Sequence, residues 1–319
     1  MITDLPTYTD YDQSGVNLLH MAWATAVGTL LTLDQLSDDM GLDGERQDEA
    51  VAHYWRTVQP QLANALSLTQ QAMELCVKAR IARVSPYLLI ANQPRDFPSG
   101  ADSGDVSFST LRTVDAIDLI RLHNTVCTDR LDRAFGTLFE NSRVERNHII
   151  HGGKSHTTID PLIIIQRVVE IFETFHPDVR WAEARHETVN KDEVWGFGLN
   201  VDYTELHLAT EFSIVVRQLP PAWIKAHFGF EKRRRAYICP HCRDRTESDR
   251  QEDFPKLAQL DADRTGLHCF VCDTRNPIER TKCLLEECPG DVMSSLGGSP
   301  ECMTCGESQE YLRRWQSPA

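Results

Sequence analysis

Eight cysteines between positions 239 and 305 have the spacing of metal ligands. They form four pairs, with two or four residues between the members of a pair: Cys239/Cys242, Cys269/Cys272, Cys283/Cys288 and Cys302/Cys305. Such a gap lets both thiolates of one tight turn face the same ion. Two turns complete a tetrahedral site, and four soft thiolates select zinc over magnesium or calcium. The sequence therefore predicts two Zn²⁺ ions bound by the eight cysteines.

The order of the pairs leaves two ligand assignments open. In the simpler, sequential one, the first four cysteines bind one ion and the last four the other. In a cross-braced one, the first pair joins the third and the second joins the fourth. His241 and His268 lie beside ligands and are expected to be their neighbours. Because four thiolates leave no coordination position open, both sites are expected to be structural, in a segment that resembles a pair of zinc ribbons or treble clefs.

A second group suited to chemistry consists of Arg146, Asn147 and His151. A guanidinium offers a fixed fork of donors to a phosphate. An imidazole titrates near neutrality and can take or give a proton. The amide of Asn147 can position a ribose hydroxyl or orient the other two groups. The three residue types together favour phosphodiester chemistry.

These three residues are expected on a short helix over residues 143–151. Ser142 and Glu145 have the spacing of a capping box at its start. Gly152-Gly153 supplies a left-handed stop after it. A histidine near such a helix end is often only a favourable cap, so the motif needs its wider context.

Arg-Asn-x-x-x-His followed by glycine, after long helices, resembles the motif of the HEPN family of all-helical domains. The resemblance covers about residues 14–176. It implies a metal-independent ribonuclease whose two copies dimerise and face their motifs across a shared cleft. By this resemblance Arg146 would stabilise the scissile phosphate, His151 would assist the 2′-hydroxyl or the leaving 5′-oxygen, and Asn147 would help. The expected product ends are a 2′,3′-cyclic phosphate and a 5′-hydroxyl.

One position departs from the relatives that nucleotidyltransferase partners silence. Those HEPN toxins carry a tyrosine two residues after the histidine, where this chain has Gly153. Modification of that kind is therefore not expected. His148 lies elsewhere on the helix surface and is not expected to take part in catalysis.

A basic run precedes the first cysteine pair and consists of Lys232, Arg233, Arg234 and Arg235. Such a run is usually a solvated linker, but it could also contact phosphates of an RNA substrate. We keep these four residues as candidate substrate-binding residues.

The remaining sequence is read as mainly α-helical. Apolar residues recur at helical spacing over several stretches, of which the second contains Pro60 and is expected to bend or divide there: residues 16–36, 49–84, 111–141, 163–175 and 204–219. Asp160-Pro161 marks the start of the fourth. Residues 180–201 are expected to form a small hairpin turning at 190–192.

These patterns predict a mainly α protein in three parts. Residues 1–178 are expected to form a HEPN-like helical bundle. Residues 179–236 are expected to be a small α/β linker region with a possible hairpin and a helix, and residues 237–319 a double zinc-ribbon-like domain. Cys76 and Cys127 lie in helical patterns and are expected to be small core residues.

The composition is that of a soluble protein with a selective surface. The chain has 319 residues, a net charge of −14 and a pI near 5.3, which opposes indiscriminate binding to nucleic acid or anionic membranes. We expect no membrane segment or signal peptide and a cytoplasmic location, where thiols stay reduced.

Two functional interpretations follow from these features. The first is a homodimeric endoribonuclease, a toxin or antiphage defence effector, whose zinc ribbons recruit RNA or respond to a regulatory protein or nucleic-acid trigger. In it, zinc is not needed for catalysis. The second is a non-catalytic adaptor that dimerises through its helical half and binds protein or nucleic acid through the zinc module.

Overall fold

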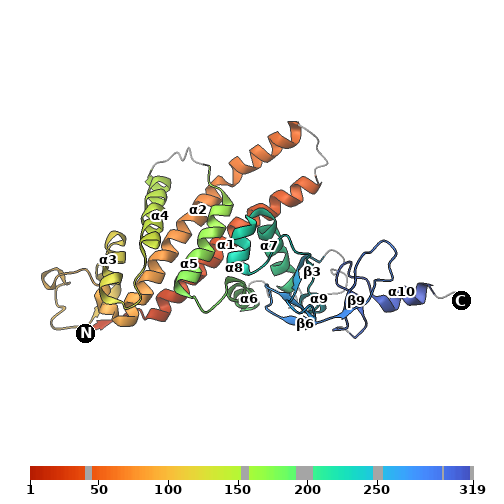
Figure 1. Cartoon of the computed structure of the whole chain (residues 1–319). Coiled ribbons are helices and arrows are strands. Elements are labelled where there is room, and N and C mark those ends of the chain that lie inside the picture. Colours follow the sequence, from red (N-terminus) through yellow and green to blue (C-terminus); the bar gives the residue numbers. More distant parts are fainter. Residues whose placement is uncertain (40–44, 152–157, 192–203, 247–253, 297, 317–319) are drawn as a thin grey trace. The chain divides into compact units, whose positions relative to one another are not determined.

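The computed structural model describes the chain except for residues 40–44, 152–157, 192–203, 247–253, 297 and 317–319. The chain is mainly helical, with its longer strands and the cysteine clusters toward the C-terminus (Figure 1). It divides into two compact units, residues 1–175 and residues 176–319. The division places the predicted linker region in the same unit as the cysteine clusters.

Within its described residues, the first unit contains five α-helices: α1 (Tyr8–Asp39), α2 (Glu45–Val84), α3 (Ala116–Val126), α4 (Arg133–His151) and α5 (Pro161–Phe175). Helix α2 is central, because it contacts each of the other four (Figure 1). The shared core includes the fully buried side chains of Leu19, Trp23, Leu62 and Met73. Burial of each such side chain stabilises the folded state by about 1.5–3 kcal/mol.

Smaller elements complete the first unit. A parallel strand pair joins β1 (Ile2–Thr3) to β2 (Val106–Ser107). Single 3₁₀ turns occupy Pro86–Leu89, Pro94–Asp96 and Phe108–Thr110.

Helix α1 contains a stretch, Tyr8–Leu36, that is long and apolar enough to cross a membrane by length and composition alone. The expectation that no apolar run reaches such a length was therefore wrong. Several apolar residues of α1, among them Ala22 and Val27, are buried in the unit, where α1 packs against α2 and α5, whereas Met21 and Leu36 are exposed. Such burial is what a core helix of a globular unit requires.

Helix α2 is continuous through Pro60, so of the two expected outcomes the division was wrong, and the bend stays a prediction. Proline removes one backbone hydrogen bond and crowds the preceding turn. Pro60 lies on the exposed side of the helix, where water can satisfy the carbonyl group that loses its partner. Packing of the long helix against its neighbours outweighs this local cost.

Helix α4 begins at Arg133, ten residues or nearly three turns earlier than the start at residue 143 that the sequence indicated. Asp132 is its N-cap, with Oδ1 accepting a hydrogen bond of 2.7 Å from the backbone N–H of Phe135. Ser142 is therefore in the middle of the helix and buried, and the predicted capping box was wrong. Glu145 forms an ion pair of 2.5 Å with Arg167 of α5. Its carboxylate therefore joins two helices and does not cap the start of one.

The predicted start of α5 is confirmed. Oδ1 of Asp160 accepts a hydrogen bond of 2.9 Å from the backbone of Leu162, and Pro161 is the first helical residue. The chain just before this helix is fastened to α2, because the Gln59 amide exchanges two hydrogen bonds with the backbone of Ile159. These contacts hold the backbone at Ile159, just before α5, against α2.

The second unit starts with helices rather than a hairpin. Trp181 and Arg185 are four residues apart on helix α6, so they lie on the same face, and this face is buried. The expected hairpin over this region was therefore wrong for residues 181–191, and its remaining residues, up to 201, fall largely outside the described ones. The unit's first three described helices are α6 (Trp181–Lys191), α7 (Thr204–Gln218) and α8 (Pro221–Phe228). Helix α7 ends just before the predicted prolines, and α8 ends at the left-handed Gly229.

Two small antiparallel sheets follow, each carrying one group of cysteines. The first has the order β3–β4–β5–β6, with Ala258 of β4 opposite both Tyr237 and Cys269. The second has the order β7–β8–β9, with Met293 opposite Cys302. The strands are short: β3 (Tyr237–Ile238), β4 (Lys256–Leu260), β5 (Gly266–Cys269), β6 (Arg275–Pro277), β7 (Glu279–Arg280), β8 (Val292–Ser294) and β9 (Glu301–Cys302). Helices α9 (Pro240–Asp244) and α10 (Gln309–Gln316) complete the unit.

Candidate metal centres and the arginine–histidine helix

The first candidate metal centre lies at the end of the first sheet. Cys239 follows β3 as the N-cap of α9, and Cys242 lies in α9. Cys269 ends β5, and Cys272 follows in the turn before β6. Their sulfur atoms all lie within 4.8 Å of one another, and at least three of the side chains are buried. The antiparallel pairing of β3, β4 and β5 brings the two cysteine turns together from positions 27 or more residues apart.

The second candidate centre repeats this arrangement on the second sheet. It consists of Cys283, Cys288, Cys302 and Cys305, whose sulfur atoms also lie within 4.8 Å of one another. Gly290 sits directly against it, because a Cβ atom there would come within 2.7 Å of the Cys302 sulfur. The ligand grouping is therefore sequential in both centres, and the cross-braced alternative is wrong.

The sulfur–sulfur distances fit a tetrahedral ion. They are 3.7 Å for Cys239–Cys272, 3.8 Å for Cys283–Cys305 and 3.9 Å for Cys288–Cys302. An ion with bonds of about 2.3 Å to four tetrahedral sulfurs separates them by about 3.8 Å. Disulfides need a separation of about 2.05 Å, so these cysteines are unbridged. Each group of four can hold one metal ion.

Donors around the sulfurs complete the first centre. The Cys239 sulfur accepts a backbone hydrogen bond from Cys242 at 3.5 Å and a side-chain one from Asn276 at 3.9 Å. Such donors orient a thiolate and disperse its charge. The sequence pattern did not reveal Asn276, since it follows the ligands on β6 and belongs to no cysteine turn.

The second centre has equivalent donors. The Gln309 amide donates to the Cys283 sulfur at 3.5 Å, and the backbone of Gly290 donates to the Cys288 sulfur at 3.4 Å. Gln309 begins α10, so this short helix supports the centre from outside the knuckles. Its only sequence signal is the amide type four residues after Cys305.

Crowding of the thiols makes the first centre depend on a cation. Contacts with Cys239 and Cys272 raise the pKa of Cys242 and of Cys269 well above the ordinary value, and burial adds to the effect. The same mutual contacts lower the pKa of Cys272. Four thiolates therefore cannot share this space without a positive charge, which a divalent ion would supply.

The two histidines beside the ligands are neighbours, as expected. His268 is exposed, and its Nε2 lies 2.7 Å from Oδ1 of Asp273. His241 lies in α9, outside both groups of candidate ligands. Of the other two cysteines, Cys76 is a buried core residue whose pKa burial raises to about 12, and Cys127 is half-buried.

The two candidate centres are joined to each other. The backbone N–H of Ile238 donates to the carbonyl of Met303 at 2.8 Å, which links β3 to the last knuckle. Arg243 of α9 forms an ion pair of 3.0 Å with Glu301, and both side chains are largely shielded from solvent. Gly306, at φ +83°, lets the Arg243 guanidinium pass close to the backbone. The two metal-binding modules therefore form one structural unit.

Helices α6 and α7 meet in a buried polar cluster. Arg185 donates two hydrogen bonds, of 3.0 and 2.7 Å, to the carboxylate of Glu211, and His207 lies 3.1 Å from the same carboxylate. Burial opposes ionisation of Glu211, but the hydrogen bonds from His207 and Arg185 outweigh it and lower its pKa to about 2. The cluster holds α6 and α7 together.

A neighbouring pair connects these helices to the first metal centre. His186 of α6 lies 3.0 Å from Glu205 of α7, and Arg245, just after α9, lies 3.4 Å from the same glutamate. The hydrogen bond that His186 donates to the Glu205 carboxylate raises the pKa of His186 against the effect of burial. Arg180, before α6, also pairs with Asp273 beside the second knuckle, at 2.8 Å. Helices α6 and α7 therefore pack beside the first centre and contact residues that flank its cysteines.

The predicted catalytic residues lie on α4. Arg146 is half-buried, its Nη1 donates a hydrogen bond of 3.0 Å to Oδ1 of Asn147, and its buried Nε has no hydrogen-bond partner among the described residues. Glu145 does not neutralise it, because that carboxylate accepts two hydrogen bonds from Arg167. His151 ends the helix, but its side chain lies outside the described part of the structure.

Helical geometry relates the three positions. Asn147 and His151 are four residues apart, so they occupy the same face on consecutive turns. Arg146 belongs to an adjacent face, and its hydrogen bond to Asn147 draws the guanidinium toward that shared face. His148 is exposed on another side of the helix. The helix thus places Asn147 on the face to which position 151 belongs and holds the Arg146 guanidinium against Asn147.

The predicted basic run is fastened to its surroundings. Lys232 donates to the carbonyls of Arg217 and Leu219 at the end of α7, at 3.1 and 3.0 Å, and so caps that helix. Arg234 donates to the carbonyl of Leu260, and Arg235 donates to Thr304 at 3.3 Å and lies over the Tyr237 ring. Arg233 is exposed. Contact of these residues with phosphate stays a prediction.

Comparison with known proteins adds no assignment. No family model matches the chain, and no curated protein or solved structure matches it either. The site must therefore be interpreted from its own geometry.

Proposed function

We propose that this protein is a metal-independent endoribonuclease of the HEPN type, acting through Arg146, Asn147 and His151. The proposal is carried by the state of Arg146. Its guanidinium is partly desolvated, its Nε has no partner among the described residues, and the adjacent carboxylate of Glu145 is occupied by Arg167. A guanidinium with spare donors and no neutralising carboxylate is suited to bind an anion such as a phosphodiester.

The proposed reaction needs a nucleophile within the substrate. The 2′-oxygen of a ribose attacks the adjacent phosphorus, the bond to the 5′-oxygen breaks, and the products carry a 2′,3′-cyclic phosphate and a 5′-hydroxyl. Arg146 would stabilise the charge that develops on the phosphoryl oxygens. His151 would take the proton of the 2′-hydroxyl or protonate the leaving oxygen, and Asn147 would hold the guanidinium in place.

Each chain offers one histidine of this motif, whereas the reaction needs both a base and an acid. A two-fold symmetric dimer would bring a second copy of the same helix face to one phosphate. We therefore propose a homodimer with a composite site between the two copies of α4. The partner's copy of the motif would supply the second proton-transfer group.

We further propose that the two cysteine centres bind Zn²⁺ as zinc-ribbon-like modules. Their donor sets, four sulfurs each at tetrahedral separations, match structural zinc sites and leave no coordination position for substrate. Zinc would supply folding free energy to the second unit, while the unit recognises RNA or a regulatory molecule. Reduced thiols fit the cytoplasm, and a nuclease with a separate recognition module fits a toxin or antiphage effector.

Cleavage of RNA by purified variants tests the proposal. Wild-type protein is incubated with mixed RNAs in the presence of EDTA, with its metal content measured before and after. We expect Arg146→Ala and His151→Ala to lower the cleavage rate by about 10²–10³. The matched controls are Arg143→Ala and His148→Ala, which remove the same side chains from other positions of α4. Equal loss in the controls, or products ending in a 3′-hydroxyl, would refute the mechanism.

The alternative is an adaptor without catalytic activity. The net charge of −14 and the closed metal centres favour it, because both fit a binding module better than a nuclease acting on many RNAs. Intact RNA with every substrate tried, together with a normal dimer and full metal content, would establish the adaptor instead.

A further inference from the structure

The second unit contains a pocket of about 310 Å³ whose lining includes none of the eight cysteines, although His268 and Phe270 of the lining flank Cys269. It is bounded by the end of α8, by the segment that follows α8, and by the face of the first sheet. Its volume is at the lower end of the range for small-molecule sites. The wall is aromatic, with Phe228, Phe230 and Phe270, whereas Arg234 and Asp261 line it with charge.

The wall of the pocket is held in place by its own hydrogen bonds. The Gln259 side chain of β4 accepts from the backbone N–H of Glu231 at 2.9 Å and donates to the Glu231 carbonyl at 2.8 Å. Lys232 fastens the same segment to the end of α7. Phe270 stacks on Phe228 with ring centroids 5.3 Å apart. The pocket is therefore preformed, which lowers the entropic cost of binding a ligand.

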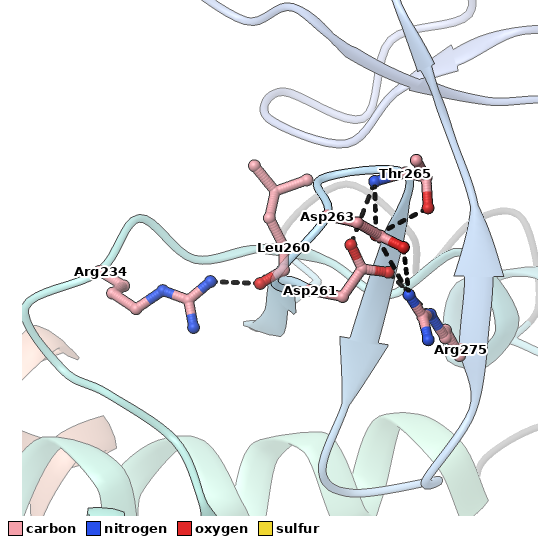
Figure 2. Close-up of polar contacts among 6 residues, drawn as sticks. All are labelled: Arg234, Leu260, Asp261, Asp263, Thr265 and Arg275. Atoms are coloured by element: carbon pink, nitrogen blue, oxygen red, sulfur yellow. Dashed lines mark hydrogen bonds and ion pairs between the residues drawn. The ribbon is translucent and has the colours of Figure 1, made fainter.

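Charge is distributed unequally around the pocket. Figure 2 shows Arg234 reaching the carbonyl of Leu260 from one side, while Asp261, Asp263 and Arg275 interact with one another on the other side. Arg275 is thus neutralised by two aspartates. Among the described residues, no carboxylate lies within ion-pair distance of Arg234, and it uses a single hydrogen bond. Arg234 is consequently the lining cation with donors to spare.

The surroundings reinforce this positive end. Residues 225–235 contain five basic side chains and one acidic one, in a chain whose net charge is −14. An anion is therefore favoured at the Arg234 end, while carboxylate oxygens at the Asp261 end can accept from hydroxyl or amino groups. The same pocket also has an apolar aromatic wall. A ligand that matches these three kinds of group has a phosphate, a flat apolar body and hydrogen-bond donors.

We propose that this pocket binds a nucleotide, with its phosphate at Arg234, its base against the aromatic wall and its donor groups toward Asp261. Aromatic and arginine side chains are the usual partners of unpaired nucleotides. The nucleotide could belong to single-stranded RNA or be a free nucleoside phosphate. In taking RNA as the source we rest on the proposed ribonuclease function, but the affinity for a nucleotide rests on the pocket alone.

Binding is measured with the full-length, metal-loaded protein carrying His151→Ala, so that RNA is not consumed. Fluorescence anisotropy follows a labelled single-stranded RNA of ten nucleotides, and unlabelled AMP is the competitor. The variants are Arg234→Ala, which removes the phosphate donor, and Leu260→Trp, which fills the pocket without changing charge. The control is Lys256→Ala, which removes an exposed cation that lies outside the pocket on β4, the strand of Leu260. Metal content and circular dichroism verify that each variant is folded.

We expect Arg234→Ala and Leu260→Trp each to weaken binding about tenfold, and Lys256→Ala to change it less than about threefold. Displacement of the RNA by AMP with the same dependence on Arg234 identifies a free nucleotide as ligand, whereas RNA binding that AMP does not displace identifies the strand. Absence of binding to both, unchanged binding in Leu260→Trp, or equal loss in Lys256→Ala overturns the proposal. RNA cleavage in the Arg234→Ala protein with His151 restored is scored separately, so failure of the pocket and failure of the nuclease are distinguishable.

Discussion

The buried ion pair between α6 and α7 offers a quantitative test of what holds the second unit together. Glu211 is 3% exposed and Arg185 is 8% exposed, and two hydrogen bonds join them. Glu211→Gln keeps the size of the side chain but removes its charge. The guanidinium of Arg185 would then be buried without a counter-charge, and the new amide group would direct donors toward donors.

The size of the effect follows from the pKa of Glu211. Its hydrogen bonds lower that pKa from 4.5 to about 2, which corresponds to about 3 kcal/mol of stability at neutral pH. Because the folded pKa is the lower one, this stability is present above the ordinary pKa of 4.5. It is lost as the pH falls through the range from about 4.5 to about 2. Removing one partner of a buried pair costs about 3–5 kcal/mol, which is of the same order.

Urea unfolding resolved by amide hydrogen exchange in residues 181–191 and 204–218 measures the effect on these helices. We expect Glu211→Gln to lower their free energy of unfolding by about 3 kcal/mol at pH 7 and by only about 1 kcal/mol at pH 3. Loss of metal at low pH affects both proteins, so their difference isolates Glu211. The control is Glu183→Gln on the exposed side of α6, with an expected change below about 0.5 kcal/mol. A difference that is small at pH 7, or that does not shrink toward pH 3, would refute this account of the cluster.

Three further predictions concern the candidate metal centres, helix α1 and the start of α4. Elemental analysis is expected to find two metal ions per chain, and Cys288→Ser is expected to remove one of them while destabilising the whole second unit, since the two modules are joined. Gly290→Ala is expected to weaken metal binding, because its Cβ would lie 2.7 Å from a ligand sulfur, whereas Gly28→Ala, with no atom within 4 Å, should stabilise α1 by up to about 1 kcal/mol. Thermal unfolding with and without a chelator checks the two glycine substitutions. Asp132→Ala is expected to lower the stability of the first unit by about 1 kcal/mol, and Ser142→Ala to leave it almost unchanged; the reverse order would restore the capping box predicted from sequence.

Signals confined to a few neighbouring residues were reliable in the sequence. The cysteine pairs were evident because one tight turn determines which two thiolates face an ion. The start of α5 was evident because Asp160-Pro161 satisfies and shapes a helix end locally. The mainly helical class followed from apolar periodicity, which reports the face that each helix must bury.

Other features were decided by residues far apart in the chain. Ser142 and Glu145 fit a capping box, but Asp132 is the N-cap and Arg167 binds Glu145, so the helix continues through the predicted start. Pro60 is tolerated since packing of α2 outweighs one lost hydrogen bond. Local rules rank alternatives by small energies, and tertiary contacts of similar or larger energy then choose among them.

By itself, therefore, the sequence predicted eight cysteines in pairs that could hold metal, and it predicted that Arg146 and Asn147 would share a helix with His151. Only the tertiary structure decided that the cysteines group sequentially, because strand pairing brings the two knuckles of each sheet together. It alone placed Arg234 in the lining of a pocket and engaged the carboxylate of Glu145, next to Arg146, with Arg167. The reason is physical: spacing along the chain determines what one turn can reach, whereas charge balance and burial depend on every element that packs nearby.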